Sequence, residues 1–179
     1  QYRFRFLKNI MGLWMIQSIR RNLDKKYSFA ELETMAREAS DFTSIVDVND
    51  DCFMNPVNMI DAVKEYCAKS GQPVPETIGQ VMQCVYISLA DCYAKSIKGL
   101  EKITGKTYTS INIVGGGSKD GYLNELTAKA SGLTVFAGPT EGTALGNLMV
   151  LMMDEGEYAD LAEAREAIKA SFEIKEIHA

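Results

Sequence analysis

The chain has 179 residues, of which 46% are apolar and 24% charged, so it can form a folded core and does not resemble a disordered segment. Its net charge of −5 argues against the broad basic surface of a nucleic-acid-binding protein. No apolar stretch approaches the length of a membrane span. We therefore expect a cytoplasmic protein with no nucleic-acid or membrane partner, folded as one domain over residues 1–179.

The only histidine, His178, is the penultimate residue. Ser-His-Asp chemistry, a Cys-His dyad and a histidine metal cluster are therefore not expected, and we predict no catalytic and no metal-binding residue in this chain. The four cysteines, Cys52, Cys67, Cys84 and Cys92, form no C-x-x-C pair, and reduced thiols are the default expectation. A bridge between Cys67 and Cys84, on either side of a proline-containing connection, remains open.

The first half of the chain is predicted to be helical. An apolar stripe over residues 6–14 predicts an amphipathic helix at the start. The capping-box pattern at residues 28–31 predicts a second helix that runs to about Ala39. Residues 45–48 are expected to form a short strand.

A third helix is predicted to begin at Asn55-Pro56 and to end near Gly71. The longest helical pattern runs from Ile78 to Thr104, with Gly105 after it. The acidic loop at residues 47–51, before the third helix, lacks the glycine and the bidentate glutamate of a calcium loop, so a solvated turn is favoured.

The second half changes to alternating strands and helices, which predicts a parallel sheet with right-handed crossovers and an α/β fold. The expected elements are strands at residues 111–114 and 133–137, with helices at residues 122–130, 144–152 and 159–169.

The first of these strands runs directly into Gly115, Gly116 and Gly117. Without side chains, their main-chain amides can touch a ligand, and the following helix contributes free N–H donors at its N-terminus. Such a junction suits phosphate, or the ribose and base of a nucleotide. The alternative is a tight turn in which glycine only allows close packing. The spacing matches neither the dinucleotide G-x-G-x-x-G motif nor a P-loop.

A second glycine-containing junction follows the next strand at residues 137–143. Its pattern predicts a strand-to-helix connector, with Thr140 or Glu141 at the start of the helix. Asn9 and Gln17 lie beside the first apolar stripe, where a position at the solvent edge is the simplest interpretation.

Three stretches together, residues 9–17, 114–118 and 137–147, resemble the carboxyl-terminal domain of the FGGY carbohydrate kinases, within the actin and hexokinase superfamily. The resemblance implies an α/β, ribonuclease-H-like (actin-like ATPase) domain that is rich in helices and has a mixed sheet. It also implies that ATP and Mg²⁺ serve as phosphoryl donor and cofactor. The stretch at residues 8–14 favours members that phosphorylate O1 of L-rhamnulose over those acting on L-fuculose, xylulose, ribulose or glycerol.

Carried over from the family, the resemblance implies that Asn9 and Gln17 contact the nucleotide and that Gly115, Gly116 and Gly117 lie against it. The carboxyl-terminal domain mainly supplies the adenosine side of the cleft. The sugar pocket, the phosphate loop and the catalytic aspartate would belong to an amino-terminal domain outside this chain, so the chain alone is expected to be inactive.

Two positions qualify the resemblance. Asp120 stands where many relatives have asparagine, and its charge argues against direct contact with a nucleotide. Some relatives have a cystine at positions matching Cys67 and Cys84, which leaves that bridge open.

Two other interpretations rival that of a kinase domain. They are a non-catalytic nucleotide-binding module and a purely structural helical domain.

Overall fold

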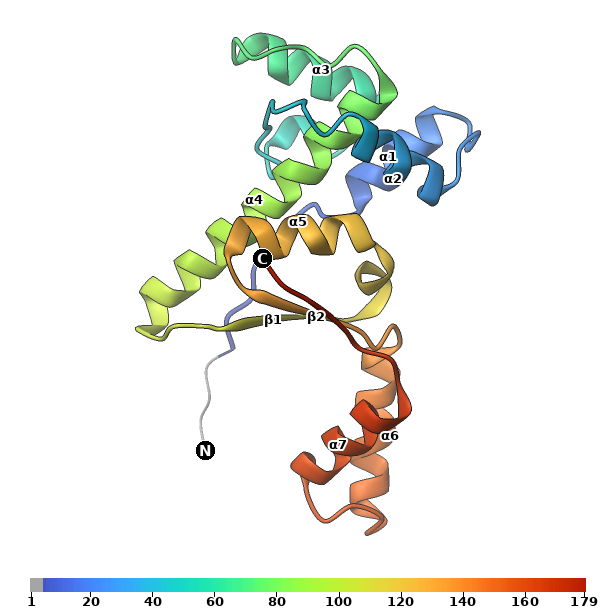
Figure 1. Ribbon diagram of the computed structural model, residues 1–179, viewed down its shortest axis with the longest axis vertical. Helices are drawn as coiled ribbons and strands as arrows, with labels where there is room; N and C mark the ends of the chain where they lie inside the picture. The colour runs from blue at the N-terminus through green and yellow to red at the C-terminus, as the bar shows by residue number, and fades with distance from the viewer. Residues whose placement is uncertain (1–4) are drawn as a thin grey trace. The chain divides into compact units, whose positions relative to one another are not determined.

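The computed structural model describes residues 5–179 (Figure 1). The chain divides into two compact units. The first unit comprises residues 1–107 and the second comprises residues 108–179. None of the helices within residues 5–179 is both long enough and apolar enough to cross a bilayer.

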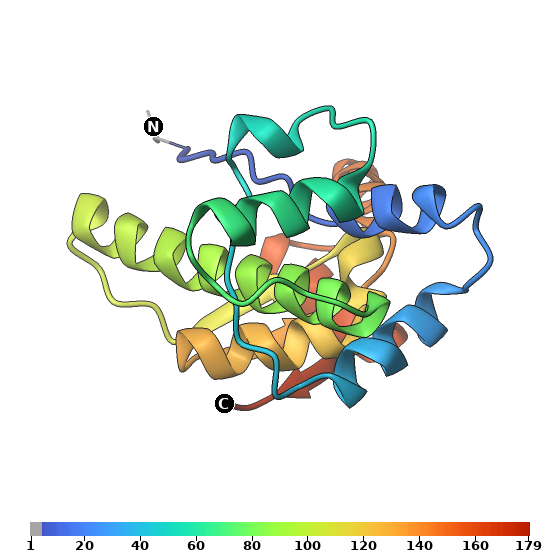
Figure 2. The same cartoon turned by 90° about the horizontal axis from the view of Figure 1, so that it is seen from above.

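The first unit is helical. Its long helix α4 has 27 residues, which corresponds to about 40 Å, and Figure 2 shows it nearly side-on. Thr77 and Gln80 form a capping box at its start, and Gly105 ends it in the left-handed conformation, so the predicted span of 78–104 is confirmed. The elements of this unit are α1 (Trp14–Asn22), α2 (Phe29–Glu38), the 3₁₀ turn η1 (Asp51–Phe53), α3 (Met59–Lys69) and α4 (Ile78–Thr104).

The core of the first unit forms where α1, α2 and α3 pack on α4, with the most extensive packing between α2 and α4. Ser28 caps α2 and pairs with Glu31 in the predicted capping box. The largest fully buried side chains of this unit are Met15, Ile16, Ile19, Leu32, Val48, Phe53, Met59, Val63, Val81, Met82, Tyr86 and Leu89.

The first predicted helix was placed too early. Residues 5–11 are not helical, and α1 begins at Trp14. The chain turns at Gly12, whose φ of +58° is left-handed and incompatible with a helix that continues through it. The apolar Phe6 and Leu7 are consequently 52% and 79% exposed rather than part of a helical stripe.

Two further predictions in this unit were wrong. Residues 45–48 form no strand, because the N–H and C=O of Ile45 bond to the side-chain amide of Gln72 and the N–H of Val46 donates to Ser88 Oγ. Helix α3 begins after Asn58 rather than at residue 55, because the Asn58 side chain accepts hydrogen bonds from the N–H groups of residues 60 and 61.

The second unit contains a three-stranded sheet in the order β1-β2-β3. Strands β1 (Ser110–Ile113) and β2 (Thr134–Ala137) are parallel, as predicted. The unpredicted strand β3 (Lys175–Ile177) runs antiparallel to β2, so the sheet is mixed, as the family resemblance implied. The other elements are the 3₁₀ turn η2 (Gly115–Lys119) and the helices α5 (Gly121–Ser131), α6 (Gly142–Asp154) and α7 (Leu161–Ser171).

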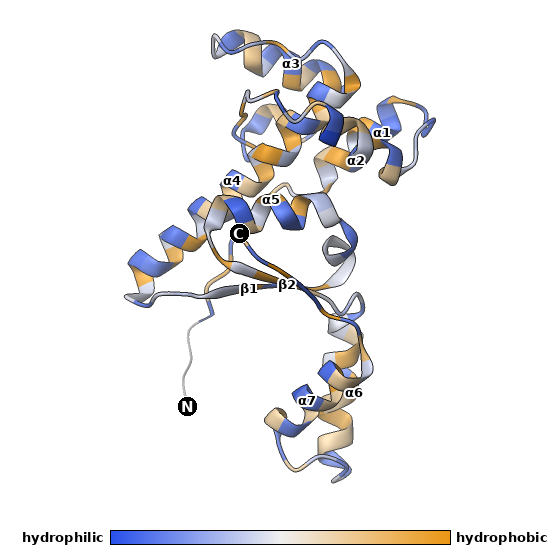
Figure 3. Cartoon of the chain, in the orientation of Figure 1, coloured by the Kyte–Doolittle hydropathy of each residue, from blue (hydrophilic) through white to orange (hydrophobic). Residues whose placement is uncertain are grey.

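Helix α5 packs on β2, whose Val135 and Ala137 are buried, and it ends at Gly132 as predicted. Helices α6 and α7 pack on each other. Figure 3 shows that α6 is predominantly apolar, yet Leu148, Val150 and Leu151 are exposed.

Candidate functional site

The three glycines form a 3₁₀ turn between β1 and α5. Val114 is still extended, and the turn Gly115–Lys119 follows it directly. Gly115 has φ of +78°, a left-handed conformation that a residue without a Cβ adopts at little cost. The hydroxyl of Ser118 donates to the carbonyl oxygen of Gly115 at 2.7 Å, and Asp120 ends the turn as the N-cap of α5. The sequence placed this strand–turn–helix junction correctly.

Gly116 is the most open of the three glycines in the turn. It is exposed, and a Cβ built on it would have no heavy atom within 4 Å. A Cβ on Gly117 would make only ordinary contact with Ile113, at 3.6 Å. The packing of residues 5–179 therefore gives no reason for glycine at position 116. The interpretation in which a ligand approaches the main chain at this residue stays a prediction.

The two glycine-containing junctions are joined by main-chain hydrogen bonds. The N–H of Gly138 donates to the carbonyl oxygen of Ile113 at 2.8 Å, and the N–H of Gly115 donates to that of Pro139 at 3.2 Å. Since β1 and β2 are parallel, both junctions lie at the carboxyl edge of the sheet, where α/β proteins bind ligands.

The second junction also packs closely on the first. A Cβ on Gly142 would lie 3.0 Å from Cβ of Val114, so a larger residue would press on the strand that leads into the glycine turn. Glu141 is the N-cap residue of α6, as predicted, although its side chain makes no capping hydrogen bond. The junction is a strand-to-helix connector that is bonded to and packed against the glycine turn, which the sequence pattern did not indicate.

The charge at the start of α5 bears on which part of a ligand fits there. The carboxylate of Asp120 accepts a hydrogen bond from the N–H of Leu123 at 3.0 Å, so it already uses one of the donors at the helix N-terminus. Its negative charge offsets the partial positive charge of the helix end. A phosphate gains less at such a terminus than at an uncharged one. The junction therefore suits the neutral nucleoside part of a nucleotide better than its phosphates.

Asn124, in the first turns of α5, was not singled out from the sequence. Its side chain is 1% exposed, and its Nδ2 donates to the carbonyl oxygen of Ser118 at 3.2 Å. Within residues 5–179, no donor reaches its Oδ1. This property depends on tertiary packing, and no local sequence pattern could have indicated it.

Asn9 and Gln17 belong to the first unit. Asn9 lies in the irregular segment before α1, and Gln17 lies on the outer face of α1. Both side chains are exposed, and among residues 5–179 neither has a hydrogen-bond partner. The guanidinium of Arg21 stacks on the ring of Trp14 at 4.1 Å on this same helix. The nucleotide contacts of Asn9 and Gln17 stay a prediction.

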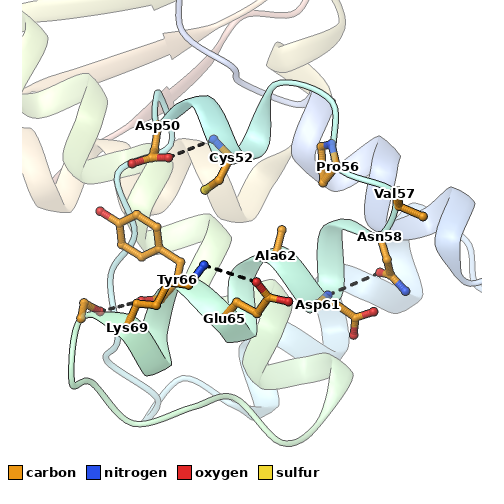
Figure 4. Close-up of a pocket in the computed structure, with 11 residues that line it drawn as sticks. Asp50, Cys52, Pro56, Val57, Asn58, Asp61, Ala62, Glu65, Tyr66 and Lys69 are labelled. Atoms are coloured by element: carbon orange, nitrogen blue, oxygen red, sulfur yellow. Dashed lines mark hydrogen bonds and ion pairs between the residues drawn. The ribbon is translucent and has the colours of Figure 1, made fainter.

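A separate cavity of about 650 Å³ lies in the first unit, outside the predicted site (Figure 4). Asp50 accepts a hydrogen bond from the N–H of Cys52, which lowers the pKa of its carboxyl, and Glu65 pairs with Lys69 at 3.5 Å. The polar side chains that line this cavity are thus used in helix caps and ion pairs with neighbouring residues. The lining residues are Asp50, Cys52, Pro56, Val57, Asn58, Asp61, Ala62, Glu65, Tyr66, Lys69 and Ser70.

The part of the chain that the structure describes holds no group of three or more His, Cys, Asp or Glu side chains placed to bind a metal ion. All four cysteines are free thiols, so the bridge that the sequence left open between Cys67 and Cys84 is not formed.

The family model described as the C-terminal domain of the FGGY family of carbohydrate kinases matches residues 2–155. The chain belongs to this family, whose C-terminal domain has the actin-like ATPase fold.

The chain is similar to curated proteins named rhamnulokinase. It is 48% identical over 174 residues to the one from Halalkalibacterium halodurans, 44% over 171 residues to that of Bacillus subtilis, and 41% over 174 residues to that of Bacteroides thetaiotaomicron. These alignments cover 96–97% of this chain and 35–37% of the relatives, so the chain spans little more than a third of their length.

Proposed function

We propose that this chain is the nucleotide-binding, carboxyl-terminal part of an ATP-dependent kinase that converts L-rhamnulose to L-rhamnulose 1-phosphate in L-rhamnose catabolism. Membership of the FGGY family supports the class of reaction. The choice of sugar is supported by relatives named rhamnulokinase at 41–48% identity. We further propose that the protein is cytoplasmic.

The observation that carries the nucleotide assignment is the open main chain at Gly116. No described side chain or backbone atom would obstruct a Cβ there, so the free space on the turn is available to a ligand. In our proposal the main chain of residues 115–117 lies against the adenosine of ATP, and the side-chain amides of Asn9 and Gln17 make further contacts to the nucleotide. Neutral amide groups suit the hydroxyl and ring-nitrogen atoms of adenosine.

Mg²⁺ is proposed to accompany the phosphates of ATP, where it neutralises charge during phosphoryl transfer. Because residues 5–179 hold no cluster of side chains suited to a metal ion, we assign no ligand for it in this chain. The chain contributes binding and orientation of the nucleotide, which are major sources of rate acceleration in phosphoryl transfer.

Activity is proposed to require an amino-terminal domain of the same polypeptide, which supplies the base for the sugar hydroxyl and most of the sugar pocket. Residues 1–179 alone are then expected to turn over no L-rhamnulose, although they retain weak affinity for adenine nucleotides. Kinase activity of the purified 179-residue chain would contradict this division of labour.

The proposal is tested with Gly116→Ala in the full-length gene product. The added methyl group meets no protein atom, so the melting temperature is expected to stay within about 2 °C of wild type. It occupies the space proposed for the nucleotide, so the Kd for MgADP by calorimetry is expected to rise at least about tenfold. Gly99→Ala in α4, which also meets nothing within 4 Å, is the matched control and is expected to bind normally.

Unchanged MgADP binding by Gly116→Ala would overturn the assignment. Comparing phosphorylation of L-rhamnulose, L-fuculose, xylulose, ribulose and glycerol by the full-length protein tests the sugar. Nucleotide binding without turnover of any of these sugars would instead favour a non-catalytic binding module.

A further inference from the structure

Asn124 lies directly beneath the glycine turn and has an unusual hydrogen-bonding pattern. Its Nδ2 donates to the carbonyl oxygen of Ser118, whereas its Oδ1 has no donor within residues 5–179 although the side chain is 1% exposed. Reversing the amide would place two acceptors, Oδ1 and the Ser118 oxygen, against each other, so the orientation is fixed by its partner.

An unsatisfied buried acceptor destabilises a fold, and such atoms are rare in native proteins. Leucine has nearly the same size and shape and would fill the same space without this cost. Stability therefore does not account for asparagine at position 124. What asparagine provides and leucine lacks is the N–H donor directed at Ser118.

Ser118 links Asn124 to the glycine turn through two hydrogen bonds. Its hydroxyl donates to the carbonyl oxygen of Gly115 at 2.7 Å, while its own carbonyl accepts from Asn124. The two bonds run from the body of α5 through Ser118 to the first residue of the turn. They hold the first and fourth residues of the η2 turn, and Gly116 lies between these two residues.

We propose that Asn124 is a positioning residue that fixes the glycine turn in the conformation that binds the nucleotide. The inference rests on the proposed function, since it assumes that the turn is where adenosine binds. Asn124 itself does not touch the nucleotide. Asn124 orders the turn before the nucleotide binds, so that binding involves a smaller loss of conformational entropy.

Asn124→Leu in the full-length gene product separates this role from a structural one. We expect the melting temperature to stay within about 2 °C of wild type, because removal of the unsatisfied acceptor offsets loss of the hydrogen bond to Ser118. The Kd for MgADP and the KM for MgATP are expected to rise about tenfold, while kcat and the KM for L-rhamnulose stay within about twofold. Thr127→Val is the matched control. Thr127 is buried on the same helix and its hydroxyl donates to the helix carbonyl of Leu123, so nucleotide affinity is expected to stay within about twofold.

Asn124→Asp provides a rescue experiment. Ionised, the aspartate presents an oxygen in place of the N–H and repels the Ser118 carbonyl. Protonated, its hydroxyl restores a donor, and burial raises the pKa of a carboxyl placed there. We therefore expect the MgADP affinity of this variant, relative to wild type at each pH, to recover as the pH falls from 8 to about 5.5.

Wild-type nucleotide affinity in Asn124→Leu would overturn the inference, as would a parallel loss of melting temperature, kcat and both KM values. A ratio of affinities for Asn124→Asp that does not change with pH would also overturn it. Gly116→Ala distinguishes failure of the role of Asn124 from failure of the proposed function. If that variant loses MgADP binding while Asn124→Leu keeps it, only the role of Asn124 fails. If both bind normally, the proposed function fails as well.

Discussion

Gly79 in α4 lies directly against the main chain of Met35 in α2. A Cβ on Gly79 would stand 2.5 Å from the carbonyl oxygen of Met35, a distance that real Cβ atoms do not tolerate. This contact sets how closely the two most extensively packed helices of the first unit approach each other.

Gly79→Ala is therefore expected to destabilise the protein by about 1–3 kcal/mol, since α2 and α4 must move apart. Gly99→Ala, further along the same helix with open space around it, is expected to stabilise by about 0.5–1 kcal/mol through helix propensity. Chemical denaturation followed by far-UV circular dichroism measures both. Equal stability of the two variants would contradict the packing argument.

The capping box of α2 predicts a pH-dependent contribution to stability. The N–H of Ser28 and its hydroxyl each donate to Glu31 Oε2 at 2.7 Å, and they lower the pKa of Glu31 below its ordinary value of 4.5, the N–H having the larger effect. A lowered folded-state pKa means that the stabilisation is present above pH 4.5 and is lost as the pH falls through the folded-state pKa.

Glu31→Gln is accordingly expected to be less stable than wild type at pH 7, with a difference that shrinks as the pH falls below 4.5. Ser28→Ala is expected to cost about 1 kcal/mol. The stabilities of the wild type, the two single variants and the double variant are compared at pH 7 and again below pH 4.5. This cycle isolates the coupling between Ser28 and Glu31. Additive losses at pH 7 would show that the capping box contributes nothing as a pair.

The cysteines are expected to be reduced and to react unequally. Cys52 is exposed, yet its pKa is raised to about 12, mainly because its sulfur is partly desolvated and further because it lies beside the carboxylate of Asp50. Since the thiolate is the nucleophile, iodoacetamide at pH 8 should modify Cys52 slowly. Asp50→Asn keeps a side chain able to cap η1 and removes the charge, so a rate increase of about threefold or more is expected.

Cys67 and Cys84 are buried, and burial raises the pKa of both thiols. They should resist alkylation in the native protein and react after unfolding without reductant. Mass mapping of the alkylated peptides checks both cysteines. Recovery of a peptide pair linked through these two residues would instead establish the bridge.

Asp120 is expected to act through its hydrogen bond to α5 rather than through the nucleotide. Asp120→Asn retains a good N-cap and should change the Kd for MgADP by less than about twofold. Asp120→Ala removes the acceptor for the N–H of Leu123 and should lower stability by about 1 kcal/mol. A large gain in nucleotide affinity in the asparagine variant would show that the carboxylate faces the ligand.

Asn9→Ala and Gln17→Ala test the two amide contacts carried over from the family. Loss of a neutral hydrogen bond is worth about 0.5–1.5 kcal/mol, so each variant of the full-length gene product is expected to raise the KM for MgATP about two- to tenfold. Glu38→Ala, on the exposed surface of α2, is the control. Unchanged KM values in both amide variants would favour the solvent-edge interpretation.

The elements that the sequence predicted best were those with strong local start and stop signals. Helix α4 was placed correctly because its apolar face begins at Ile78 and Gly105 marks its end, whereas the capping box of Thr77 and Gln80 was recognised only in the structure. Hydrophobic periodicity alone was less reliable. It extended the first helix through Gly12, which breaks it, and it suggested a strand at residues 45–48 that has no neighbouring strand and bonds to side chains instead.

The same contrast holds for the candidate site. The glycine turn was predicted because a strand, three glycines and a helix are contiguous in the chain. Its pairing with the junction at residues 137–143 depends on the register of β1 and β2, and the unsatisfied Oδ1 of Asn124 depends on how α5 packs under the turn. Neither follows from neighbouring residues.

The two main-chain hydrogen bonds that join the glycine junctions have an evolutionary consequence. Gly115 and Gly138 each donate to a carbonyl of the other strand or its extension, so a residue inserted between Ile113 and Gly115, or between Gly138 and Pro139, would displace a donor from its acceptor. A change of length in these two short segments is therefore expected to weaken the link between the junctions. Among descendants of this gene, insertions and deletions should accumulate in other connections, and drift at these loops should be confined to substitutions.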